Sequence, residues 1–175
     1  MKQRILVAVS ILFAVACTTT KKAFVVETNG TEKNLVGYIT KEQIETNPSY
    51  SWFKENYTIG KPNAAAMQAL KAHEKEIKLL VFGGTWCGDT KALLPGFLKT
   101  VDSSGFAYKH LTLVGVDRKK HTLDNLHETY QIKNVPTVIV LDKDGKELGR
   151  VVEYGKYGVL DKEVGEIITK AFAGK

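Results

Sequence analysis

The chain has 175 residues, of which 43% are hydrophobic and 25% charged, proportions that are ordinary for one soluble globular domain. Its 25 Lys and Arg against 19 Asp and Glu give a net charge of +6. No stretch combines clustered basic residues with stacking aromatics, and "RKKH" at 118–121 is too short for a nucleic-acid footprint, so we expect no nucleic-acid partner.

Residues 1–16 have the pattern of an export signal. The cationic start "MKQR" precedes the apolar run "ILVAVSILFAVA", which is too short to span a bilayer as a helix. The run leads into "AVAC", which offers either a cleavage site at residues 14–16 or lipid modification of Cys17. "AVAC" resembles a bacterial lipobox, with Ala14 in place of the usual leucine. We therefore expect an exported lipoprotein anchored through Cys17 to a periplasm-facing membrane, inner or outer; secretion with a free thiol is the alternative.

Residues 17–35 are polar and predict a tether that contains at most a short strand at "AFVV". Residues 36–61 predict a helical N-terminal extension. Thr40 starts a helix there, because Gln43 stands at the capping-box position.

A group of aromatic residues follows within that extension, in the segment "NPSYSWFKENYTIGKPN". Tyr50, Trp52, Phe53 and Tyr57 form either a hydrophobic clasp that docks the extension on the core or a lip that contacts substrate, and the clasp is favoured.

Residues 62–175 predict one α/β domain. Short, mostly apolar runs predict strands at 77–82, 111–116, 137–141 and 147–152. Apolar side chains at helical spacing predict helices from residue 63, after Cys87, around residues 123–130 and over residues 160–172. The turn "DKDG" joins the last two strands as a hairpin. The element order implies a mixed sheet of four to five strands with helices on both faces, in a domain that folds without residues 18–61.

Several motifs occur in a fixed order on these elements. "WCG" at 86–88 opens a helix, Lys91 and Pro95 follow within it, and "VPT" at 135–137 precedes a strand. In this combination, residues 77–173 resemble a thioredoxin-fold domain. The resemblance implies a thioredoxin fold with its reactive cysteine at position 87.

Cys87 is the candidate nucleophile. A cysteine at a helix N-terminus faces unpaired backbone N–H groups, which favour the thiolate. Lys91 adds a positive charge one turn further on, whereas the carboxylate of Asp89 opposes a second negative charge. Thr90 replaces the second cysteine of the family motif, and its hydroxyl can donate a hydrogen bond to the Cys87 sulfur. Val81 stands where many thioredoxins bury an acidic residue, a further departure from the family.

The "VPT" motif and Trp86 are the candidate substrate-binding residues. The resemblance implies a cis peptide bond between Val135 and Pro136. That geometry would present the backbone of Val135 beside the Cys87 sulfur, where a client peptide can pair as an added strand.

Two classes of function fit these residues. The first is a monothiol oxidoreductase, in which Cys87 forms a mixed disulfide with a protein client and an external thiol or partner reductase resolves it. The second is a binding module that holds partners in the cis-proline groove without turnover. A peroxide-sensing cysteine and a buried inert thiol are lesser alternatives. No cofactor is implied, and the four histidines lack ligand spacing, so we expect no metal. At their spacing of six, His121 and His127 would lie on different faces of a helix, as solvated side chains.

Overall fold

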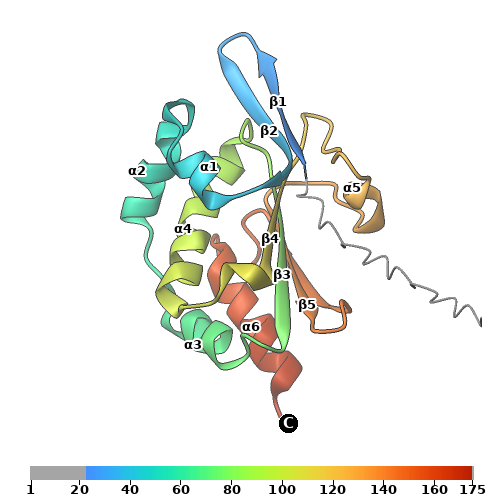
Figure 1. The fold of residues 1–175 in the computed structure, drawn as a ribbon. Helices are drawn as coiled ribbons and strands as arrows, with labels where there is room; N and C mark the ends of the chain where they lie inside the picture. Colours follow the sequence, from blue (N-terminus) through green and yellow to red (C-terminus); the bar gives the residue numbers. More distant parts are fainter. Residues whose placement is uncertain (1–22, 175) are drawn as a thin grey trace, which may run out of the picture.

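The central feature of the computed structural model, which describes residues 23–174, is a six-stranded mixed sheet (Figure 1). Its strand order is β1-β2-β4-β3-β5-β6, and only β3 and β4 pair in parallel. The strands are β1 Phe24–Asn29, β2 Glu32–Ile39, β3 Ile77–Gly83, β4 Leu111–Gly115, β5 Thr137–Asp142 and β6 Glu147–Val152. The sheet therefore has one strand more than the four to five expected. The proposed signal and Cys17 lie outside the described residues.

The longer helices cover one face of this sheet, as Figure 1 shows. They are α1 Lys41–Glu45, α2 Ser51–Ile59, α3 Ala64–Ala72, α4 Gly88–Ser104 and α6 Leu160–Phe172, with short 3-10 turns at Pro48–Tyr50 and Tyr108–His110. On the other side lies the segment 116–136, which contains the single-turn helix α5 Leu126–Thr129. Among residues 23–174, no helix is both long and apolar enough to cross a membrane.

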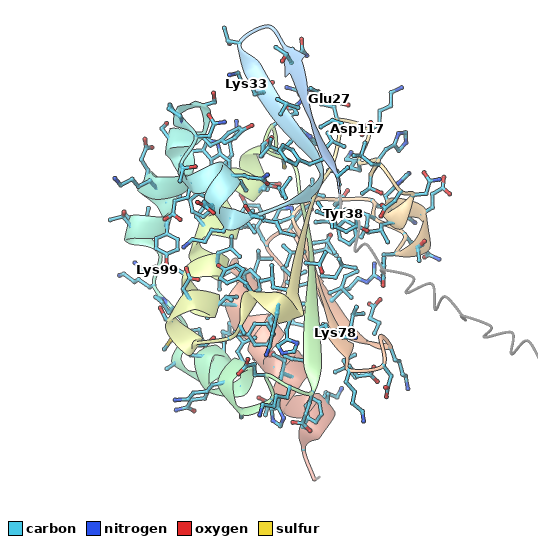
Figure 2. All side chains as sticks on the ribbon, in the orientation of Figure 1. Glu27, Lys33, Tyr38, Lys78, Lys99 and Asp117 are labelled. Atoms are coloured by element: carbon cyan, nitrogen blue, oxygen red, sulfur yellow. The ribbon has the colours of Figure 1, made fainter. Side chains whose placement is uncertain are left out.

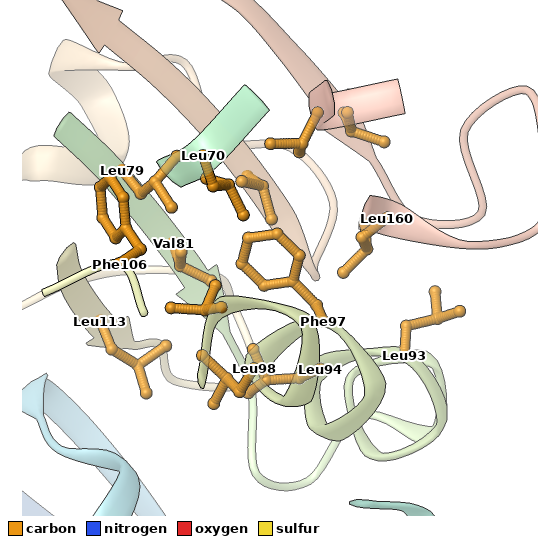
Figure 3. Close-up of a cluster of buried hydrophobic side chains, with 14 of the residues drawn as sticks. Leu70, Leu79, Val81, Leu93, Leu94, Phe97, Leu98, Phe106, Leu113 and Leu160 are labelled. Carbon is orange, nitrogen blue, oxygen red and sulfur yellow. The ribbon is translucent and has the colours of Figure 1, made fainter. Parts of the chain in front are cut away.

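Two apolar layers fill the space on either side of the sheet. The larger one joins α4 to β3, α3 and α6, with Phe97 of α4 packed beside Val81 and Leu160 (Figure 3). The smaller one lies under the segment 116–136 and includes Phe82 and Val135. Cys87 is half-buried against this smaller layer. Cys87 therefore lies where the end of β3 meets the smaller apolar layer.

The expectation of a tether through residue 35 is wrong for residues 24–35, which form most of a β-hairpin. β1 pairs with β2, and β2 continues antiparallel to β4. The Asn29-Gly30 pair lies at the turn, with Gly30 at φ 59°. All six residues of β1 are exposed, so the strand has no buried face to produce an alternating pattern.

The extension 36–61 is part of the core rather than an addition to it. Thr40 and Gln43 form the expected capping box at the start of α1. The aromatic group acts as the expected clasp, because Tyr50 and Phe53 are buried in the larger layer and Trp52 and Tyr57 pack against it. This shared core argues against the expectation that the domain folds without residues 18–61, which only a truncated chain can test.

The helix expected around residues 123–130 is reduced to the single turn of α5. Asp117 Oδ1 accepts hydrogen bonds from the backbone N–H groups of Lys119 and His121, both at 2.8 Å, which favours a turn over a helix. Lys120 and Asn125 adopt left-handed conformations, with φ 67° and 59°, which interrupt a helix.

A candidate thiol site at the start of α4

Cys87 is the N-cap residue of α4, and it follows β3 after a short loop. Its Sγ donates a hydrogen bond to the backbone oxygen of Val135 at 3.2 Å. The Val135-Pro136 peptide bond is cis, as the family resemblance implied. The bond to Val135 requires the thiol proton. When the sulfur ionises, the Val135 carbonyl is therefore free to accept a hydrogen bond from another molecule. Cys87 is a free cysteine, and it is the only thiol among residues 23–174.

Trp86 is fixed beside the sulfur by its own contacts. Its Nε1 donates to the Val116 backbone oxygen at 3.0 Å. A side chain at Gly84 would collide with the indole, since a Cβ there would lie 2.7 Å from Trp86 Cε2. The Arg118 guanidinium lies 5.5 Å from the centre of the Trp86 ring system and forms an ion pair with Glu32 of β2. Neither contact of Arg118 was expected from the sequence, in which residue 118 mattered only as part of the short basic run "RKKH".

Thr90 does not make the contact to sulfur that the sequence suggested. The Thr90 side chain is buried, and its Oγ1 accepts the Gly84 N–H at 3.2 Å; no hydrogen bond joins it to Cys87. The backbone carbonyl of Lys91 has a partner in the N-terminal extension. Pro95 has no N–H to bond the Lys91 carbonyl four residues earlier, and Asn56 Nδ2 of α2 donates to that oxygen at 3.0 Å. The N-terminal extension thus completes the hydrogen bonding of the site helix.

Asp89 has a partner that the sequence did not reveal. The Tyr154 hydroxyl donates to Asp89 Oδ1 at 2.9 Å. This hydrogen bond, together with the charge of Asp89 and a smaller effect from Cys87, raises the pKa of Tyr154 above its usual value. Tyr154 is held near the cis-proline loop by its neighbour, because the Glu153 N–H donates to the Pro136 oxygen at 2.8 Å.

The β1–β2 hairpin adjoins the site loop through Thr85. Thr85 Oγ1 accepts the Leu35 N–H at 3.1 Å and donates to the Lys33 oxygen at 3.4 Å. The Tyr50 hydroxyl donates to the same oxygen at 3.0 Å. In Figure 2, Lys33 lies on this hairpin and Asp117 on the nearby loop that precedes Arg118. The residues before the sequence-predicted domain therefore form one side of the site.

No group of three or more His, Cys, Asp or Glu side chains in the part of the chain that the structure describes could hold a metal ion. His121 and His127 nevertheless lie close together, with ring centres 4.7 Å apart, and His127 Nδ1 accepts the Thr122 N–H. The expectation that the two rings lie on different helix faces is wrong, because residues 117–125 form turns rather than a helix.

The chain was compared with known families and structures. The thioredoxin family model matches residues 38–159. Three solved structures are similar to this chain. An HIV epitope scaffold is 22% identical, with 70% of this chain and 78% of that chain covered and a TM-score of 0.44. A protein of unknown function from Pseudomonas aeruginosa is 23% identical (69% and 81% covered, TM-score 0.44), and a DsbH oxidoreductase is 21% identical (66% and 85% covered, TM-score 0.35). No curated protein matches.

Proposed function

The chain belongs to the thioredoxin family, and from that premise we propose that it is a thiol-disulfide oxidoreductase of the cell envelope that works through the single cysteine Cys87. One observation carries the proposal. The half-buried Cys87 lies at the start of a long helix, and its sulfur contacts the carbonyl of the residue before the cis-proline, where an extended client would lie.

The reaction begins with attack of the Cys87 thiolate on a client disulfide. The Sγ–S bond forms as the client S–S bond breaks, and the client sulfur that leaves takes a proton from water. An external thiolate then attacks Cys87 Sγ, which releases the reduced client and leaves the external thiol attached to Cys87. A second external thiol frees Cys87 and completes one external disulfide. Two external thiols are thus oxidised for each client disulfide reduced.

Thr90 explains why an external thiol is required. In its position a second cysteine would expel the client from the mixed disulfide within the same molecule. The Thr90 side chain is instead buried against Gly84, and no other thiol occurs among residues 23–174. The mixed disulfide of Cys87 should therefore be long-lived.

Export and lipidation of Cys17 complete the proposal. The support is the "AVAC" sequence after an apolar run. The intact mass of protein extracted from membranes of the native host tests this part. A diacylglycerol-modified N-terminal Cys17 is expected, and an unmodified Cys17 or an uncleaved N-terminus would overturn it.

Turnover of a neutral disulfide tests the enzymatic part. Bis(2-hydroxyethyl) disulfide with excess monothiol should be reduced faster with the wild-type protein than without it, and Cys87→Ser should remove the whole increase. A rate equal to the uncatalysed rate would overturn the oxidoreductase, and the binding module would then be the better account.

A further inference from the structure

We propose that Asp89 and Tyr154 form an acidic-aromatic subsite that selects clients with a basic side chain next to the reacting cysteine. This inference rests on the proposed function of Cys87 and adds the chemical class of its substrate. The subsite combines a carboxylate, for the charge of an ammonium or guanidinium group, with a phenol ring, for its face.

The position of Asp89 carries the first step. It lies in the first turn of α4, two residues after Cys87. Its Oδ1 accepts the Tyr154 hydroxyl, and no other hydrogen bond or ion pair engages the carboxylate within residues 23–174. Within this described part of the chain, no cation is paired with the negative charge of Asp89. Tyr154 orients the carboxylate without cancelling that charge.

Tyr154 is accessible but held in place. Tyr154 is 46% exposed, so its ring is open to a ligand. Its backbone oxygen accepts the Gly158 N–H at 2.8 Å, and the Lys156 N–H in the same loop donates to Glu163 Oε2 at 2.8 Å. Gly155 permits this tight loop, because it adopts φ 50° and a Cβ there would lie 2.4 Å from Glu163 Oε2. These contacts reduce the entropy cost of ordering the subsite.

The charges near Cys87 are unequally distributed. The cation beside Trp86, Arg118, is paired with Glu32 of the hairpin. Glu153, the chain neighbour of Tyr154, adds a second carboxylate, and its hydrogen bond comes from the neutral Asn134 amide. The nearest cation of α4 in the sequence is Lys91, two residues after Asp89, a spacing at which side chains of a helix do not face each other. The carboxylates around Tyr154 therefore favour a cationic ligand.

A cation–π interaction already occurs at Tyr157, in the loop that contains Tyr154. Lys162 Nζ lies 3.9 Å from the centre of the Tyr157 ring. Tyr157 is exposed to nearly the same extent as Tyr154, at 42%. Tyr154 differs because its ring has no cation from this chain within the described residues, and a client can supply one.

Three small disulfides of different charge test the subsite on the full-length protein: cystamine, a dication; bis(2-hydroxyethyl) disulfide, which is neutral; and dithiodipropionate, a dianion. The measurement is the second-order rate constant of mixed-disulfide formation on Cys87, with each charged probe normalised to the neutral one and to its reactivity with a free thiol in solution. At low salt, the wild-type protein should prefer the dication over the dianion by roughly 5- to 20-fold, a ratio consistent with a partly screened charge a few ångströms away.

The variants separate the subsite from general charge effects. Asp89→Asn should lower the dication-to-dianion ratio at least 3-fold, and Tyr154→Ala should lower it about 2-fold because the ring is lost. Asp144→Asn is the matched charge control, in the turn at the far end of β5, and Tyr157→Phe is the matched loop control. Both controls should keep the wild-type ratio.

Two results would overturn the subsite. If the neutral probe reacts normally and the normalised rates of the charged probes are equal, or do not change in Asp89→Asn, the subsite is wrong and the oxidoreductase stands. If no probe forms a mixed disulfide, the proposed function fails, and the inference fails with it.

Discussion

Replacing Thr85 with valine should weaken the contact between the β1–β2 hairpin and the site loop. Valine keeps the shape of threonine but cannot accept the Leu35 N–H, which Thr85 Oγ1 accepts at 3.1 Å. Leu35 is only 3% exposed, so its N–H would be left without a partner away from water. The Lys33 oxygen would lose one donor but keep the Tyr50 hydroxyl.

The cost of one buried, unpaired N–H is about 1–3 kcal/mol. For a domain of this size, each kcal/mol lowers the melting temperature by about 2–4 °C, so Thr85→Val should melt on the order of 2–12 °C lower. Thr85→Ser keeps the hydroxyl and is the matched control, with a smaller loss expected.

Thermal unfolding followed by circular dichroism measures the global effect, and amide hydrogen exchange locates it. Exchange of the Leu35 amide should accelerate more than exchange in β3. If Thr85→Val melts with the wild-type protein and the Leu35 amide stays equally protected, the hairpin is not held to the site by this residue.

Three further predictions follow from particular contacts. Asp102 accepts hydrogen bonds from Lys41, Tyr57 and Tyr108; burial alone would raise its pKa, but these bonds outweigh burial and lower the pKa below the usual aspartate value. The ionised Asp102 therefore stabilises the fold above the ordinary aspartate pKa, and this stabilisation is lost as the pH falls through the lower pKa of the folded state. Urea titrations should show that the stability difference between wild type and Asp102→Asn shrinks over that acid range. A difference that stays constant with pH would contradict the assignment. A chain that starts at residue 62 lacks the buried Leu35, Ile39, Ile44, Tyr50 and Phe53, each worth about 1.5–3 kcal/mol by burial, which together approach or exceed a typical total stability of about 5–15 kcal/mol. It should show no cooperative transition in calorimetry, and a sharp transition would show that the extension is dispensable. Thr90→Cys should restore a second thiol and shorten the lifetime of the mixed disulfide at least 10-fold without external thiol, as followed by quenched mass spectrometry, whereas Thr90→Ser should not; equal lifetimes would show that position 90 cannot reach the sulfur.

The local parts of the fold could be predicted from the sequence. The run "IKLLVF" is apolar except for the exposed Lys78, because β3 is central and both of its faces are covered from Leu79 onward. The capping box at Thr40 and Gln43 was equally readable, since it depends on residues three apart. The cis bond before Pro136 was accessible only through the family resemblance.

The missed features depend on residues far apart in the chain. The contact between Tyr154 and Asp89 joins residues 65 positions apart, and the contact of Arg118 with Glu32 spans 86 positions. Nothing in either local sequence indicates its partner. Asn56 is different, because the proline at position 95 signals an unpaired carbonyl in the site helix, although the sequence does not say which donor meets it. Distant partners of this kind require the three-dimensional structure.

The stoichiometry and fate of the Cys87 adduct test the central claim most directly. Wild-type protein treated with bis(2-hydroxyethyl) disulfide in the absence of other thiols, then measured by intact mass, should carry one disulfide-linked group on Cys87. The adduct should persist after the reagent is removed and disappear when an external monothiol is added. An adduct that never forms under conditions where a free cysteine peptide reacts would contradict the account, because Cys87 would then not be a working thiol.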